Sequence, residues 1–130
     1  MVQELPRILV VDDEPDMCWA LENTLCPAGY SVTATTSGVE ALELAARGSY
    51  AAAFVDAKLP DLDGLELAAL IRQRSPRTAM VLISGYFYGE DRAVAKGLEE
   101  DLFVGFVSKP FELERVRLMA RRAVTTAAER

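Results

Sequence analysis

The stretch ILVVDDEPD, residues 8–16, decides the fold: four apolar residues run directly into three acids and a proline. An unbroken apolar run of this length, followed by a proline that can start a helix, is typical of a strand buried on both faces of a parallel sheet. Similar apolar runs recur at residues 31–35, 51–55, 80–83 and 103–107. We therefore predict an α/β fold, a doubly wound five-stranded parallel sheet with five flanking helices.

Apolar residues at three- and four-residue spacing predict helices between these strands. The first is expected at residues 15–26, the third at 64–75, and the last from residue 112 onward. Ser37 followed by Glu40 has the spacing of a capping box, so the second helix is expected to begin there. The residues expected to face the sheet are Met17, Leu21, Thr24 and Leu25 in the first helix, Val39, Leu42 and Ala46 in the second, Leu67 and Ile71 in the third, and Leu113, Val116 and Ala120 in the last.

Length and composition indicate one domain, residues 1–130, with a core at about 6–124 and a tail or the start of a linker at 125–130. The chain has 130 residues, 51% of them hydrophobic, which is enough for a core without a metal or disulfides. Its net charge of -6 argues against nucleic acid or an anionic membrane as a direct partner.

Nothing in the sequence predicts export or a membrane span. No apolar run reaches the roughly 20 residues that a membrane helix needs, and the first residues lack a basic, then apolar, secretory pattern. Cys18 and Cys26 fall in one predicted helix about 12 Å apart, too far to form a disulfide with each other. A cytoplasmic location is the expectation.

Polar side chains follow four of the predicted strands, at the edge where parallel strands carry their functional groups. Asp12 and Asp13 follow the first strand, Asp56 the third, Ser84 the fourth, and Lys109, after Ser108, the fifth. Singly, an Asp or Ser at such a place is often only a helix cap or turn residue. Together, three carboxylates repel one another unless a cation offsets their charge, and Mg²⁺ prefers oxygen ligands. A carboxylate beside Mg²⁺ and a lysine can act as a nucleophile toward a phosphoryl group.

Four motifs resemble the receiver domain of two-component response regulators, a flavodoxin-like fold, over nearly the whole chain. They are ILVVDDEPD at 8–16, FVDAKLPDLDG at 54–64, VLISG at 81–85 and FVSKPF at 106–111. The resemblance implies a signalling switch that takes a phosphoryl group onto Asp56 from the phosphohistidine of a sensor histidine kinase or phosphotransfer protein. It also implies that Mg²⁺ is held by Asp12, Asp13, Asp56 and the backbone carbonyl of Lys58.

The same resemblance assigns roles near the phosphoryl group. Ser84 corresponds to the switch hydroxyl, and Lys109 to the lysine that contacts the phosphoryl group, with a cis bond to Pro110. Phe106 corresponds to the switch aromatic, without the hydroxyl of the commoner tyrosine. Lys58 and Tyr86 occupy positions that influence how fast the phosphoryl group is hydrolysed.

Residues 85–105 depart most from the family pattern, because the segment is a few residues longer than usual. The fourth helix is therefore expected to be short or irregular. Glu99, Glu100 and Asp101 could pair with the basic side of the last helix in a homodimer through helix four, strand five and helix five, or these could be two solvated surfaces. Asp61 and Asp63 are expected to solvate their loop rather than to act as extra metal ligands.

Two rival functions use the same fold. A phosphohydrolase of the haloacid dehalogenase type would need a second acid two residues after its nucleophile, where this chain has Lys58 after Asp56, so we expect a signalling domain that is not an enzyme. A pseudo-receiver would be an interaction module without phosphorylation, and it predicts loss of a key group, whereas all five polar groups are present.

Overall fold

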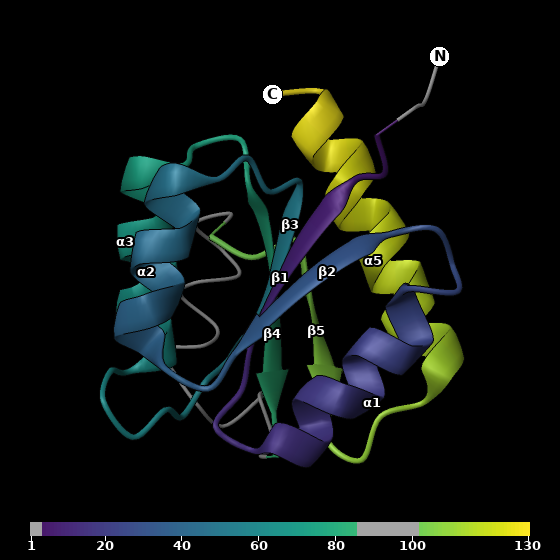
Figure 1. Ribbon diagram of the computed structural model, residues 1–130, viewed down its shortest axis with the longest axis horizontal. Coiled ribbons are helices and arrows are strands. Elements are labelled where there is room, and N and C mark those ends of the chain that lie inside the picture. The colour runs from purple at the N-terminus through teal and green to yellow at the C-terminus, as the bar shows by residue number, and fades with distance from the viewer. Residues whose placement is uncertain (1–3, 86–101) are drawn as a thin grey trace.

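The fold is a parallel sheet covered by helices on both faces (Figure 1). The computed structural model describes residues 4–85 and 102–130. Its five strands pair in the order β2-β1-β3-β4-β5, every neighbouring pair parallel. The strands are β1 (Arg7–Val11), β2 (Ser31–Thr35), β3 (Ala52–Asp56), β4 (Ala79–Ser84) and β5 (Gly105–Ser108). The helices are α1 (Pro15–Leu25), α2 (Gly38–Arg47), α3 (Gly64–Arg74) and α5 (Leu113–Ala128). The predicted fold class is confirmed.

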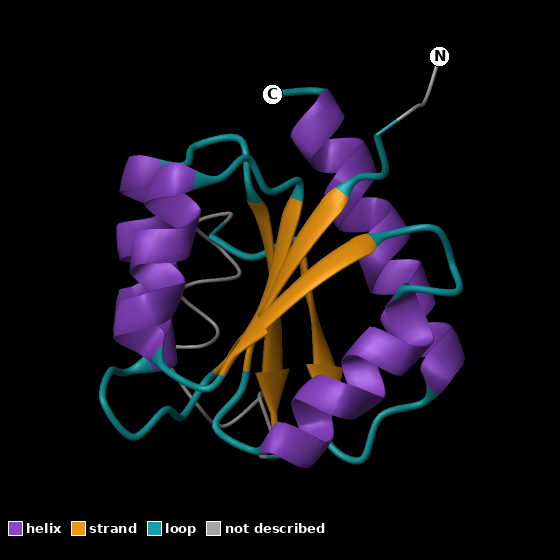
Figure 2. Cartoon of the chain, viewed as in Figure 1, coloured by secondary structure: helices purple, strands orange, loops and turns teal. Residues whose placement is uncertain are grey.

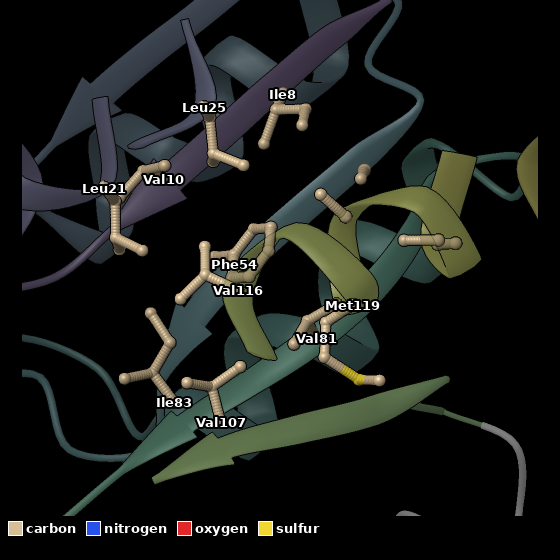
Figure 3. Packing of buried hydrophobic residues seen from close by; sticks show 14 of the residues in the cluster. Ile8, Val10, Leu21, Leu25, Phe54, Val81, Ile83, Val107, Val116 and Met119 are labelled. Atoms are coloured by element: carbon tan, nitrogen blue, oxygen red, sulfur yellow. The ribbon is translucent and has the colours of Figure 1, made fainter. Parts of the chain in front are cut away.

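Two hydrophobic clusters, one on each face of the sheet, hold these layers together. Figure 2 shows the helices on either side of the sheet. Helices α2 and α3 cover one face, over a cluster that contains Leu9, Val55 and Leu67. Helices α1 and α5 cover the other, and Figure 3 shows Phe54 of β3 with Val116 of α5 in that cluster. The central strands β1, β3 and β4 are buried on both faces, whereas the edge strands β2 and β5 are half-exposed.

The inward faces of two helices differ from the prediction. In α2 the buried residues are Gly38, Ala41 and Ala45, while Val39 is 53% exposed and Ala46 is exposed. Leu113 of α5 is 51% exposed. Val39 and Leu113 lie in the first turn of their helices. Side chains there tilt back toward the helix N-terminus, past the part of the helix that packs on the sheet. In α2, small residues also let the helix lie close to the sheet, so the alanine stripe is the buried one.

Several element boundaries also differ from the prediction. Strand β5 begins at Gly105 rather than residue 103, although Phe103 is buried. Helix α5 continues to Ala128, so residues 125–128 are helical and not the predicted tail, and Arg130 donates a hydrogen bond from Nη1 to the carbonyl of Thr78 (3.2 Å).

Three predictions fall partly or wholly outside the described residues. The fourth helix, Tyr86 and the acidic residues of the dimer hypothesis all lie in 86–101. Within the described ranges, no helix is long and apolar enough to cross a bilayer. Both cysteines are free, as expected.

Candidate functional site

The carboxyl ends of four strands bring the predicted polar residues together. Asp12 follows β1, Asp56 and Ser84 are the last residues of β3 and β4, and Lys109 follows β5. Sheet-like hydrogen bonds continue past these ends: the amide of Ala57 donates to Ile83 (2.8 Å) and that of Lys109 to Ser84 (2.8 Å). The sheet register therefore fixes where each functional side chain starts. The Lys109-Pro110 bond is cis, as the resemblance implied.

One lysine lies among the acids. Nζ of Lys109 is 3.0 Å from Oδ2 of Asp56 and 3.0 Å from Oδ2 of Asp12, and 3.8 Å from Oε1 of Glu14. The second oxygen of each aspartate accepts a backbone hydrogen bond, Asp56 from the amide of Lys58 (3.0 Å) and Asp12 from that of Glu14 (2.9 Å). Both carboxylates are thus held from two sides and point to the same ammonium group.

Three carboxylates form a cluster that can hold a cation. Oxygens of Asp12, Asp13 and Asp56 all lie within 4.8 Å of one another. Asp12 and Asp56 are buried, whereas Asp13 is exposed and open to a hydrated ion. Oδ2 of Asp12 is fully buried and, among the described residues, makes no aligned hydrogen bond, its neighbour being the Lys109 ammonium. This donor set fits a hard divalent cation such as Mg²⁺.

The electrostatics of the cluster follow from its burial. Burial raises the pKa of Asp12 to about 6, and the charge of Asp56 adds to this, against the lowering effect of the Glu14 amide and Lys109. Burial alone would lower the pKa of Lys109, but its ion pairs with Asp12 and Asp56 outweigh it and raise that pKa above its usual value. Lys109 is therefore a permanent cation, while Asp12 carries a poorly compensated charge.

The cluster opens into a pocket of about 410 Å³. Its lining consists of Asp13, Glu14, Asp56, Lys58, Ser84, Gly85 and Lys109. Ser84 is buried at the end of β4, on the strand next to Asp56. The pocket therefore has acids, an ammonium and a hydroxyl around one opening, large enough for a phosphoryl group and its ligands.

Phe106 lies at the sheet edge, beyond the pocket. Its ring is half-buried against the cluster under α2 and α3, and the guanidinium carbon of Arg115 lies 5.5 Å from the ring centroid. Arg115 also donates from Nη2 to the carbonyl of Phe106 (3.2 Å). The candidate switch aromatic is thus held by a residue of α5.

Three further residues matter here that the sequence patterns did not single out. Glu14 adjoins the acid pair in the sequence and lines the pocket. Asp61, expected only to solvate its loop, accepts hydrogen bonds from the start of α2. Asp63, for which the same was expected, caps α3 by accepting from the amides of Leu65 and Glu66. Its position just before a helix could have predicted this cap.

A family comparison identifies the class. A family model described as "Response regulator receiver domain" matches residues 8–121. The chain therefore belongs to the response regulator receiver domain family, and it is a signalling domain of two-component systems.

Relatives and solved structures agree with this. The chain is 35% identical over 118 residues to the response regulator protein PilR of Pseudomonas aeruginosa, covering 91% of this chain and 26% of that protein. It is 32% identical over 121 residues to the uncharacterized transcriptional regulatory protein YkoG of Bacillus subtilis, covering 93% and 52%. The chain spans about a quarter to a half of such curated relatives. Since some relatives are named as transcriptional regulators, the absence of a nucleic-acid partner stays a prediction.

Among solved structures, the chain is similar to the signal receiver domain of an HD domain-containing protein from Pseudomonas fluorescens. That match has a TM-score of 0.88 and 28% identity, covering 99% of this chain and 93% of the other. It is also similar to the response regulator protein TrrA of Thermotoga maritima, solved in complex with Mg(2+)-BeF. Here the TM-score is 0.80 and the identity 27%, with coverage of 92% and 99%.

Proposed function

We propose that this chain is a phosphorylation-dependent switch that accepts a phosphoryl group on Asp56 from the phosphohistidine of a sensor histidine kinase or phosphotransfer protein. The observation that carries the proposal is the placement of Asp56. Its carboxylate is buried at the end of β3, 3.0 Å from the Lys109 ammonium, and it faces a pocket shared with Ser84.

In the transfer, an Asp56 oxygen forms a bond to phosphorus while the phosphorus–nitrogen bond to the imidazole breaks. The imidazole leaves as the neutral base if its other nitrogen carries a proton. Lys109, already ionised, stabilises negative charge on the transferring oxygens, and the Ser84 hydroxyl donates a hydrogen bond to one of them. A carboxylate nucleophile, unlike a hydroxyl, has no proton to lose, so the transfer needs no general base.

Asp12, Asp13 and Asp56 would hold Mg²⁺, together with the carbonyl of Lys58. When bound, the ion supplies positive charge beside the phosphoryl oxygens. The chain's own residues prepare for this, because the amides of Glu14 and Lys58 orient the Asp12 and Asp56 carboxylates. Lys58 and Tyr86 are proposed to modulate hydrolysis of the aspartyl phosphate.

The output is proposed to be a change of the surface formed by helix four, β5 and α5. Movement of Ser84 toward the phosphoryl group lets Phe106 turn inward, which breaks its stacking on Arg115 and alters α5. A homodimer through this surface, and a cytoplasmic location, belong to the same proposal.

The proposal is tested with a small phosphodonor. The protein is incubated with acetyl phosphate and MgCl₂, and its intact mass is measured. We expect one phosphoryl increment in the wild type and none in Asp56→Asn. Asp63→Asn is the matched control, because it makes the same acid-to-amide change in the same loop, outside the cluster, and keeps an oxygen to cap α3.

Two results would contradict the proposal. No increment on the wild type would favour an interaction module that works without phosphorylation. An undiminished increment on Asp56→Asn would place the phosphoryl group on another residue.

A further inference from the structure

Asp61 joins two separate parts of the fold. It lies in the loop of residues 57–63, between β3 and α3, and its carboxylate faces the first turn of α2. Oδ1 accepts from the amide of Gly38 (3.0 Å), and Oδ2 accepts from the amide of Val39 (3.1 Å) and from Oγ of Ser37 (3.1 Å). The partners are more than 20 residues upstream, so this is a tertiary contact and not a local turn.

Close packing accompanies these hydrogen bonds. Gly38 is buried, and a Cβ atom built on it would lie 3.1 Å from Cβ of Leu62, 3.2 Å from Oδ1 of Asp61 and 3.4 Å from Cδ1 of Leu59. The loop therefore rests directly on the backbone of α2. The donors of Val39 and then Gly38 hold the pKa of Asp61 below its usual value, so the carboxylate is charged at neutral pH.

The same loop carries part of the candidate cation site. It starts directly after Asp56 and includes Lys58, whose amide donates to Asp56. The two ends of the loop are held together by an isolated β-bridge between Lys58 and Asp63. The amide of Gly64 also donates a hydrogen bond to the carbonyl of Ala57 (3.1 Å). Asp61 lies at the other side of this closed loop, where its hydrogen bonds to α2 add to the packing of Leu59 and Leu62.

We propose that Asp61 is a positioning residue for the cation site: by fastening the loop to α2, it holds the Lys58 carbonyl and the Asp56 carboxylate at the spacing that Mg²⁺ needs. This inference rests on the proposed function, because it assumes that the cluster binds the ion. Asp61 itself contacts neither the ion nor the phosphoryl group.

The test compares two variants that both weaken the start of α2. Asp61→Ala removes all three bonds between the loop and the helix. Ser37→Ala removes the hydroxyl that caps α2 through the amide of Glu40 (3.2 Å), but it keeps both backbone bonds to Asp61. Both variants lose helix capping, so a difference between them reports the fastening of the loop.

Mg²⁺ affinity is measured by calorimetric titration of each protein without phosphodonor. Groups that orient metal ligands typically change affinity by 10–100-fold, and we expect the low end, a Kd about tenfold higher, for Asp61→Ala. Ser37→Ala is expected within about twofold of wild type. Hydrogen exchange at residues 57–62 should be faster in Asp61→Ala only.

Each outcome is decisive. A Kd for Asp61→Ala within about twofold of wild type, or an equal rise in Ser37→Ala, would overturn the inference while leaving the proposed function intact. A wild type that does not bind Mg²⁺ would overturn the proposed function and this inference with it. If Asp61→Ala does not fold, Asp61→Asn keeps one acceptor oxygen and should give an intermediate Kd, and an unchanged Kd there has the same meaning.

Discussion

Gly64→Ala tests whether the backbone around Asp56 has any room. A Cβ atom on Gly64 would lie 2.0 Å from the carbonyl oxygen of Asp56 and 2.7 Å from Cα of Ala57. Real Cβ atoms essentially never come closer than 3.0 Å, so the start of α3 or the end of β3 must move by about 1 Å. Both obstructing atoms are backbone, so no side chain can rotate away. We expect a loss of about 3 kcal/mol in the free energy of unfolding, at the upper end for overpacking.

The assay is urea unfolding together with the rate of phosphorylation by acetyl phosphate. Because the clash involves Asp56 itself, the rate should fall along with the stability. Gly85→Ala is the matched control for stability: it lies beside Ser84, and its Cβ would meet no atom of the described residues within 4 Å. An unfolding free energy for Gly64→Ala within about 0.5 kcal/mol of wild type, the range of harmless surface changes, would refute the reasoning.

Three further predictions concern the polar cluster. Lys109→Met should lower the free energy of unfolding of the metal-free protein by about 3 kcal/mol, because it leaves the Asp12 and Asp56 carboxylates without their cation. MgCl₂ should restore part of this loss. Equal urea midpoints for the variant with and without MgCl₂ would contradict the prediction. Since the pKa of Asp12 is raised to about 6, a proton on this carboxylate competes with Mg²⁺ below that pH. Calorimetric titration should therefore give a Kd for Mg²⁺ about fourfold higher at pH 5.5 than at pH 7.5. A Kd independent of pH would count against Asp12 as a ligand. Because the pKa of Asp12 is higher in the folded protein than in the unfolded chain, the folded state binds this proton more tightly. The metal-free protein should therefore lose stability as the pH rises from about 4 to above 6. Ser84→Ala should still accept a phosphoryl group but lose most of the amide shift change that phosphorylation causes at Phe106 in NMR spectra; an unchanged shift would separate Ser84 from the switch.

The main features of the site are predictable from the sequence because they depend on short-range patterns. An apolar run followed by a polar residue locates a strand end, and parallel strands bring their ends together, so the amino-acid order alone groups Asp12, Asp56, Ser84 and Lys109. The distances are not predictable in this way. That one lysine lies 3.0 Å from both buried aspartates depends on the register of β1, β3, β4 and β5 together.

Other features are not predictable because they depend on contacts between distant segments. Asp61 is an ordinary loop acid in the sequence, and only the approach of α2 to the loop gives it partners. In α2 itself, two apolar stripes compete, one with Val39 and Ala46 and one with Ala41 and Ala45, while Leu42 is half-buried and packs against the core cluster as predicted. The choice between them depends on how closely the helix approaches the sheet, which periodicity alone does not specify.

The charges of the cluster imply an order of events. The ammonium of Lys109 pairs with the carboxylates of Asp12, Glu14 and Asp56, and Asp13 joins the same acid cluster, so these five groups carry a net charge of minus three when all are ionised. A phosphoryl group on Asp56 would exchange one negative charge for nearly two. Burial, and to a smaller extent the charge of Asp56, raises the pKa of Asp12 to about 6, so a buried carboxylate in this cluster is already costly to ionise without the metal. A divalent cation would bring the net charge to minus one, so its binding should precede phosphorylation, and Lys109 alone should not support transfer in the presence of a chelator.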